Sequence, residues 1–174
     1  MCLLMATGRS YAQDSVVQDS VLLKSISVAP VIHIDSSYKM PLISRAITDS
    51  MLEYSKNFIG VPYQYGGKSK RGFDCSGFVG TIYGNYGFSM PSSSSNYSRF
   101  GRSVSKKACR PGDVICFNGR NANSGRIGHV GIITEIKDGE IYFIHASVQR
   151  GVTLSKVSEA YYKPRFVTIK RILP

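Results

Sequence analysis

Long apolar runs are missing from this sequence. No stretch approaches the roughly 20 apolar residues that a membrane-spanning helix needs, so no transmembrane span is expected. There is also no internal repeat. The length of 174 residues suits one domain with its own core. With 43% hydrophobic and 19% charged residues, the composition is globular rather than disordered.

Acidic residues are scarce, with 11 Asp and Glu against 22 Lys and Arg, which gives a net charge of +11. This balance favours anionic partners such as nucleic acid, anionic lipid or an acidic cell-wall polymer. The basic residues are scattered, and no nucleic-acid-binding motif or aromatic interleaving accompanies them. We therefore expect no nucleic acid as a partner, and anionic lipid and anionic cell-wall polymers remain open.

The cysteines form no metal-binding pattern. Cys2, Cys75, Cys109 and Cys116 include no C-x-x-C pair and no paired histidine ligands, so neither a metal nor a cofactor is expected. The spacing is not that of a disulfide framework either. Cys109 and Cys116 could form a bridge if the fold brought them together, but two small apolar core residues are the favoured interpretation.

The N-terminal segment resembles the end of a secretion signal. The short apolar run MCLLMATG precedes Ser10-Tyr11-Ala12, which has the small-x-small form of a cleavage site. We expect residues 1–12 to be a signal-peptide remnant and the protein to act outside the cytoplasm, in the periplasm, in the cell envelope or after secretion. A lipidated Cys2 and ordinary structure remain as alternatives. Residues 13–43 are expected to form a linker or surface segment, and residues 44–174 one folded domain.

Two helices are predicted before the strands begin. The first covers residues 44–59, with Ser44 as N-cap and an apolar face repeating at spacings of four, three and four. That face consists of Ile47, Met51, Tyr54 and Phe58. The second helix runs from Cys75 to about Asn85 with Asp74 as its N-cap, and a glycine-rich basic loop precedes it.

Strands are predicted in the second half, at residues 113–118, 129–137, 140–147 and 165–173. Asp138-Gly139 is a strong two-residue hairpin signal between the middle two. Helices followed by an antiparallel sheet indicate an α+β fold.

Cys75 is the candidate nucleophile, because a helix N-terminus favours the thiolate form of a cysteine. His129 opens a strand after a glycine-rich loop, where its side chain can face a cleft and act as a base. His145 lies on the hairpin partner within reach of His129. A buried structural cysteine and structural histidines are the alternatives. His33 has no such context.

Five blocks of sequence carry a resemblance to the NlpC-type cell-wall cysteine peptidases of the papain-like superfamily. They keep the family order and span about residues 45–172. The blocks are PYQYGG at 62–67, GFDCSGFV at 72–79, PGDVI at 111–115, GHVGI at 128–132 and IHAS at 144–147.

The resemblance implies a papain-like fold, with N-terminal helices packed on a central antiparallel sheet. It also implies an extracytoplasmic hydrolase that cleaves peptidoglycan stem peptides, typically between D-glutamate and the diamino acid, without a cofactor. We expect the protein to be a monomer. Cys75 is then the nucleophile, His129 the general base and acid, and His145 the residue that orients His129.

The resemblance also assigns residues around the nucleophile. Tyr63 would line the site and help to bind the oxyanion, with a core aromatic as the alternative. Asp74 and Ser76 would help to bind substrate, and a plain N-cap is the alternative for Asp74.

Two other functions remain open. An inactive wall-binding module would need no working nucleophile, although the nucleophile and both histidines are intact. Amidase, transpeptidase or acyltransferase chemistry could use the same thioester. The sequence does not identify the diamino acid or the biological role.

Overall fold

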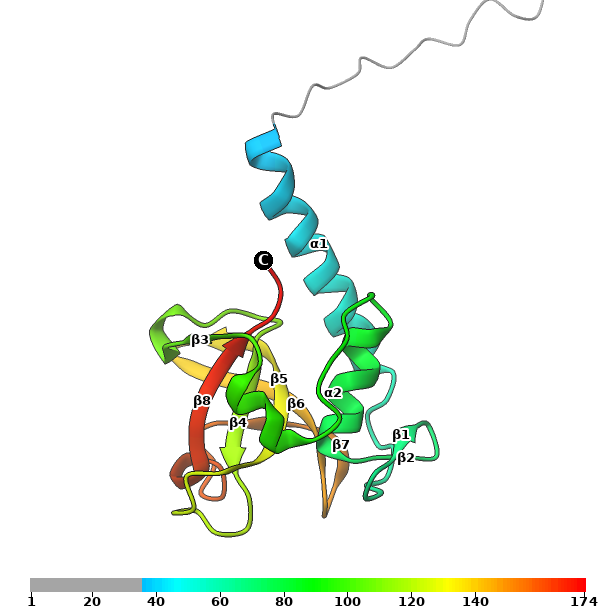
Figure 1. Cartoon of the computed structure of the whole chain (residues 1–174), viewed down its shortest axis with the longest axis vertical. Helices are drawn as coiled ribbons and strands as arrows, with labels where there is room; N and C mark the ends of the chain where they lie inside the picture. The colour runs from blue at the N-terminus through cyan, green and yellow to red at the C-terminus, as the bar shows by residue number, and fades with distance from the viewer. Residues whose placement is uncertain (1–35) are drawn as a thin grey trace, which may run out of the picture. The chain divides into compact units, whose positions relative to one another are not determined.

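The computed structural model describes residues 36–174 (Figure 1). The expectations for residues 1–12, for Cys2 and for His33 lie outside this range. Helix α1 covers Ser36–Lys56 and α2 covers Cys75–Gly84. Short 3-10 helices occur at Ser94–Arg99, Lys106–Ala108 and Lys163–Arg165 (η1, η2 and η3). The strands are β1 Lys68–Ser69, β2 Gly72–Phe73, β3 Arg102–Val104, β4 Val114–Asn118, β5 Ile127–Lys137, β6 Glu140–Ser147, β7 Gly151–Lys156 and β8 Phe166–Arg171.

Helix α1 begins ahead of its predicted start. Ser44 was expected to cap the helix, but this prediction is wrong, because Ser44 lies within α1 and its hydroxyl donates to the Pro174 carbonyl at 2.9 Å. The apolar stripe starts only at Ile47, so periodicity could not reveal the earlier turns. Met51 and Phe58 of the predicted stripe are buried, but the helix ends at Lys56, so Phe58 lies beyond it and the predicted end at residue 59 is wrong.

Six strands form one antiparallel sheet in the order β3-β8-β4-β5-β6-β7. The four predicted strands correspond to β4, β5, β6 and β8, and the α+β class is confirmed. Strands β3 and β7 were not predicted, since β3 is short and largely exposed and β7 has few apolar residues. The sheet therefore extends beyond the predicted strands at both edges.

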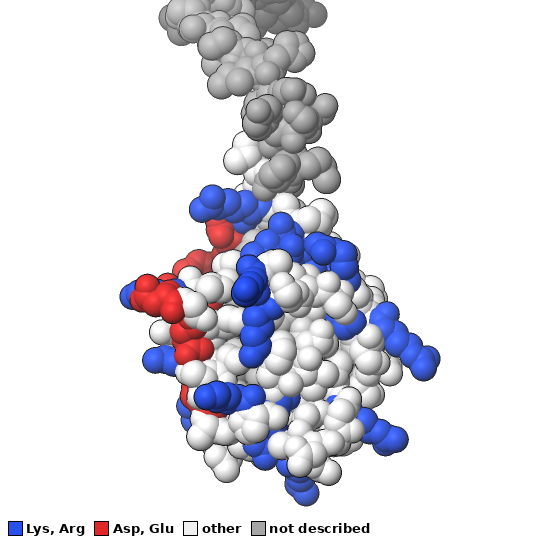
Figure 2. All heavy atoms as spheres, turned by 90° about the vertical axis from the view of Figure 1, so that its left-hand side faces the viewer, with Lys and Arg blue, Asp and Glu red and all other residues white. Residues whose placement is uncertain are grey.

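Strand β3 forms one edge of the sheet and, together with η2, carries positive charge. Arg102, Lys106 and Lys107 on β3 and η2 are exposed. Charged side chains on an edge strand discourage pairing with another chain. Figure 2 shows the side on which β3 lies in Figure 1, where Lys and Arg side chains are spread widely and Asp and Glu gather along one margin.

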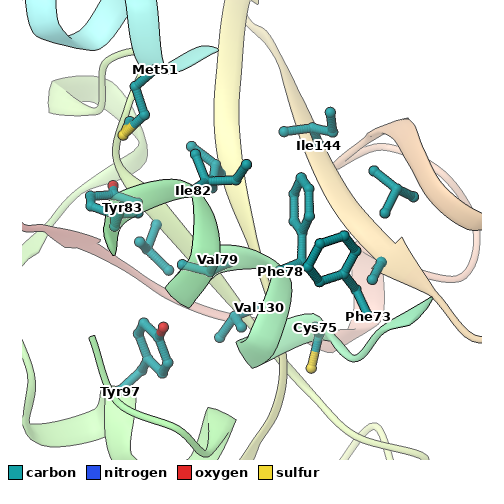
Figure 3. Packing of buried hydrophobic residues seen from close by; sticks show 14 of the residues in the cluster. Met51, Phe73, Cys75, Phe78, Val79, Ile82, Tyr83, Tyr97, Val130 and Ile144 are labelled. Atoms are coloured by element: carbon teal, nitrogen blue, oxygen red, sulfur yellow. The ribbon is translucent and has the colours of Figure 1, made fainter. Parts of the chain in front are cut away.

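The main core lies between α2 and one face of the sheet. Phe78, Val79 and Ile82 from α2 pack with Val130 and Ile144 from the central strands, and all five are fully buried (Figure 3). Burying a side chain of this size contributes about 1.5–3 kcal/mol. This packing fixes the N-terminus of α2, and Cys75 with it, against β5. A second cluster around Phe117 and Phe143 covers the other face of the sheet.

The predicted hairpin is present between β5 and β6. Asp138 and Gly139 both have positive φ, 51° and 78°, as a type I′ turn requires, and Lys137 pairs with Glu140. A register shift follows, in which Ile133 pairs with Phe143 and one residue of β5 is left over as a bulge.

This bulge decides on which face His145 lies relative to His129. If the register of the turn continued unchanged, His129 would pair with Val148, and His145 would point to the opposite face. Continuing the shifted register places His129 opposite Ser147 instead, so His145 becomes its diagonal neighbour on the same face.

None of the helices within residues 36–174 is both long and apolar enough to cross a lipid bilayer.

Candidate active site

Cys75 is the first residue of α2, as predicted. The carboxylate of Asp74 caps the helix by accepting a hydrogen bond from the Gly77 backbone N–H at 2.6 Å. The cysteine is buried except for a small exposed area. The N-terminal amide groups of α2 therefore lie around the sulfur atom.

Asp74 also ties the preceding loop to this helix. Its second oxygen accepts from the Gly66 N–H at 2.9 Å, and its first oxygen also accepts from the Ser76 hydroxyl at 3.0 Å. The loop comes so close that a Cβ atom at Gly77 would lie 2.1 Å from the Gly67 carbonyl oxygen. Glycine is therefore required two residues after the nucleophile.

The resting thiol is not activated by its position. Burial raises the pKa of Cys75, and the negative charge of Asp74 raises it further. Backbone N–H groups of Val130, Ser76 and Cys75 itself lower the pKa, but they do not outweigh burial. The expectation of a lowered thiol pKa is therefore wrong, although these amides are placed to stabilise negative charge that develops during a reaction.

The two predicted histidines are directly hydrogen-bonded. His129 Nε2 and His145 Nδ1 are 2.9 Å apart, with the rings nearly perpendicular. His145 is fully buried, and its Nε2 is 3.1 Å from the Ser155 hydroxyl and 3.2 Å from the Tyr162 hydroxyl. His129 is half-buried, and its Nδ1 is free of these contacts.

Both histidines are neutral near pH 7. Burial lowers the pKa of His129 to about 4 and the pKa of His145 well below its usual range. The charges of His129 and Arg150 also lower the pKa of His145. A neutral His145 can accept at Nδ1 from the Nε2–H of His129, which leaves His129 Nδ1 as the acceptor for another proton.

Arg150, Ser155, Glu159 and Tyr162 extend this network and were missed by the sequence analysis. The Arg150 guanidinium donates to the Ser155 hydroxyl at 2.7 Å and lies 3.4 Å from the Glu159 carboxylate. Ser155 lies on β7, which was not predicted, so no strand could place it beside His145. The other three occur in no recognisable motif.

An open cavity of about 780 Å³ gives access to these groups. Cys75, His129 and Tyr63 all line it, so the structure brings these predicted residues together, while His145 lies behind His129. The other lining residues are Tyr65, Gly119, Arg120, Gly128, Ser147, Val148, Gln149, Arg150, Glu159, Tyr161 and Tyr162.

Tyr63 is half-buried and pairs with Phe73 through a parallel bridge next to the nucleophile. Burial raises the pKa of its hydroxyl, and the charges of Cys75 and Asp74 raise it further. The phenol therefore stays protonated and can donate a hydrogen bond into the cavity. This location differs from that of a wholly buried core aromatic.

Neither Asp74 nor Ser76 lines the cavity. The hydroxyl of Ser76 is buried and donates to Asp74 or to the Ser92 carbonyl at 3.1 Å. Asp74 uses both oxygens on the loop and the helix. Both side chains hold the turn that carries Cys75, and the contact with substrate stays a prediction.

No cluster of metal-binding side chains occurs within the described range 36–174. Cys109 and Cys116 are free thiols, and Cys116 is fully buried in the core, so the alternative of a bridge between them is wrong. The groups that line the cavity include a thiol, an imidazole and a phenol. They are suited to nucleophilic attack on a carbonyl group.

The sequence is similar to those of known cell-wall peptidases. The NlpC/P60 family profile matches residues 60–171. "Murein DD-endopeptidase MepS/Murein LD-carboxypeptidase" of Escherichia coli (strain K12) is 36% identical over 73% of this chain and 64% of its own length. "Gamma-D-glutamyl-L-lysine dipeptidyl-peptidase" of Bacillus cereus is 35% identical over 72% of this chain and 37% of its own length. The chain thus spans less than two thirds of either relative.

A crystal structure of an NlpC/P60 family protein from Bacillus cereus has the same fold. It aligns with a TM-score of 0.65 and 34% identity, over 73% of this chain and 40% of that chain.

Proposed function

The chain belongs to the NlpC/P60 family, and on this basis we propose that it is a peptidoglycan hydrolase, a cysteine endopeptidase that cleaves stem peptides. The observation that carries the proposal is the cavity in which Cys75, at the N-terminus of α2, shares the wall with His129, which is hydrogen-bonded to His145. The names of the relatives support peptidoglycan as the substrate.

Acylation begins with two neutral partners. Nδ1 of His129 removes the thiol proton as the sulfur of Cys75 attacks the carbonyl carbon of the scissile bond. The Cys75 backbone N–H and the Tyr63 hydroxyl donate hydrogen bonds to the oxyanion that forms. Because the thiol is buried, its negative charge exists only while these donors can stabilise it.

Acylation ends when the protonated His129 donates its proton to the leaving amine, so that the C–N bond breaks and the thioester remains. In deacylation the neutral ring takes a proton from the water that attacks the thioester, and it passes this proton to the departing sulfur of Cys75. His145 accepts a hydrogen bond from Nε2–H of His129 throughout, so it orients the ring without carrying charge. Arg150 and Ser155 hold His145 from behind and are positioning residues.

The scissile bond we propose is that between D-glutamate and the diamino acid, as the name of the Bacillus cereus relative indicates for its own substrate. The second candidate is the D,D cross-link, favoured by the name of the Escherichia coli relative. The leaving amine belongs to the diamino acid in both cases, so the groups around Cys75 serve either reaction.

Defined muropeptides distinguish these bonds. We expect the enzyme to cut an uncross-linked stem tripeptide after D-glutamate and to leave a D,D-cross-linked dimer joined. Release of monomers with intact stems from the dimer would instead assign the second bond. If neither substrate is cleaved, the endopeptidase proposal is wrong, and new cross-links or acylated amines would identify a transferase.

The proposed site of action is outside the cytoplasm, where peptidoglycan lies. The signal-like pattern in residues 1–12 and the relatives' activity on the wall support this location. Fractionation of cells that express the full chain tests it, and a purely cytoplasmic protein would contradict it.

A further inference from the structure

A second cavity of about 640 Å³ opens beside η1, at the ends of β5 and β8. Two of its lining residues carry positive charge, and none of the described residues that line it is acidic. The lining residues are Ser95, Ser98, Ser103, Gly125, Arg126, Ile127, Val167, Thr168 and Lys170.

Lys170 is the unusual residue of this cavity, because only 6% of its surface is exposed. Its ammonium donates to the Ser98 carbonyl at 2.9 Å and to the Ser103 hydroxyl at 3.1 Å, and both are uncharged acceptors. In the described part of the chain, no carboxylate lies within ion-pair distance of it.

A buried charge without a counter-charge is costly for a folded protein, and an ammonium group has three donors to satisfy. Two donors of Lys170 are used within the protein. Arg126 adds an exposed positive charge at the rim of the cavity. An anionic group that entered the cavity would satisfy the third donor and neutralise the buried charge.

The position of this cavity relates it to the catalytic site. The first cavity is lined by the loop between β6 and β7, whereas the second lies at β8, on the other side of β5 in the strand order. The connection between β4 and β5 contributes to both, with Arg120 in the first cavity and Arg126 in the second. A chain bound across Cys75 and leaving the first cavity would therefore run toward the second.

We propose that the Lys170 cavity is a substrate subsite that binds a free carboxylate of the stem peptide, in a part of the peptide that extends beyond the first cavity. The proposal rests on the proposed function, because it takes the stem peptide as the ligand. Stem peptides carry free carboxylates on D-glutamate, on some diamino acids and at the C-terminus. A compact ammonium can pair with any of these.

Single amidation of the substrate tests this subsite. A series of stem peptides, each with a different free carboxylate converted to the amide, is assayed with wild type and with Lys170→Met. Loss of a charge-assisted hydrogen bond costs about 1.5–3 kcal/mol, so we expect amidation of one carboxylate to raise KM by roughly 10- to 100-fold in wild type. The same amidation should have almost no effect on KM in Lys170→Met.

Two further variants test whether the positive charge of Lys170, and not any other change in the protein, determines KM. Lys170→Arg keeps the positive charge, so its KM for the free carboxylate should remain within about threefold of wild type. Lys137→Met removes a charge from the exposed end of β5, outside both cavities, and should behave as wild type.

The outcomes are distinguishable. If every peptide is cleaved and no amidation raises KM in wild type, the subsite is wrong whether or not Lys170→Met folds, and the proposed function stands. If an amidation effect persists in Lys170→Met, another residue binds that carboxylate and the assignment to Lys170 fails. If wild type cleaves no peptide, both proposals fail.

Discussion

At the scale of single residues, the protonation of the two reactive groups determines how the site works. His129 has a pKa lowered to about 4 by burial, and burial raises the pKa of Cys75. Near pH 7 the cavity therefore holds a protonated thiol and a neutral imidazole. The thiolate forms during attack and not before it.

These shifts predict a broad pH optimum. Since the pKa of His129 is lowered, the ring remains a competent base until the pH falls toward about 4, and a raised thiol pKa places the alkaline limit above 9.0. We expect kcat/KM on a stem peptide to be level between these limits. An acid limb near 6.5, the ordinary pKa of histidine, would show that His129 is not buried in the working enzyme.

Because His145 is buried, its mutation should affect kcat and not KM. It is fully enclosed and cannot touch substrate, so His145→Ala should lower kcat by about 10²–10⁴-fold through loss of the His129 orientation, with KM nearly unchanged. His145→Asn retains an acceptor and should recover at least tenfold of the loss. Thermal unfolding of each variant controls for stability. A change confined to KM would contradict the positioning role.

At the scale of elements, the hairpin of β5 and β6 shows which features of the fold could be predicted from the sequence. The Asp138-Gly139 turn and both strands were predictable, because turn residues and alternation are local signals. The bulge has no such signal, yet it determines whether His129 and His145 share a face. Local patterns thus supplied the candidates for the site, and only the structure could show how they meet.

The start of α2 gives a second case. Asp74 was predictable as a cap from its place before an apolar stripe, and the structure confirms it. Its additional bond to the Gly66 N–H could not be predicted, because it joins the helix to a loop that has no periodicity. The contact between Ser155 and His145 could not be predicted either, because Ser155 lies on a strand that the sequence pattern did not indicate.

Variants of Asp74 distinguish its role as a helix cap from the effect of its charge on the Cys75 pKa. Asp74→Asn can still cap the helix but removes a negative charge that raises the Cys75 pKa, so iodoacetamide should alkylate Cys75 at a lower pH than in wild type. Asp74→Ala should also cost about 1–2 kcal/mol in the free energy of unfolding. Ser76→Ala, which leaves the charge, is the control. An unchanged alkylation profile in Asp74→Asn would contradict this account.

At the scale of the whole molecule, the excess of positive charge supports the expectation that the protein binds anionic wall polymers. We expect the net charge of +11 and the exposed cations of β3 and η2 to favour contact with carboxylate- and phosphate-bearing polymers. Salt screens such interactions over about 10 Å at 0.1 M. No specific motif is required for this attraction.

Sedimentation with purified cell-wall sacculi measures the contribution of charge. We expect the fraction of Cys75→Ala protein that is bound to fall several-fold when NaCl is raised from about 0.02 to 0.5 M. Arg102→Glu combined with Lys106→Glu should lower binding at low salt while the melting temperature stays within a few degrees. Binding that is indifferent to salt would exclude the charged surface as the cause.

Digestion of purified peptidoglycan by wild type and Cys75→Ala side by side, with mass spectrometry of the soluble products, tests the central claim most directly. We predict new stem-peptide ends after D-glutamate with wild type and none with Cys75→Ala, whose fold is checked by circular dichroism. The mass of the fragments also identifies the diamino acid. Equal products from both proteins, or none from several wall types with folded wild type, would contradict the assignment of Cys75 as the nucleophile of a wall endopeptidase.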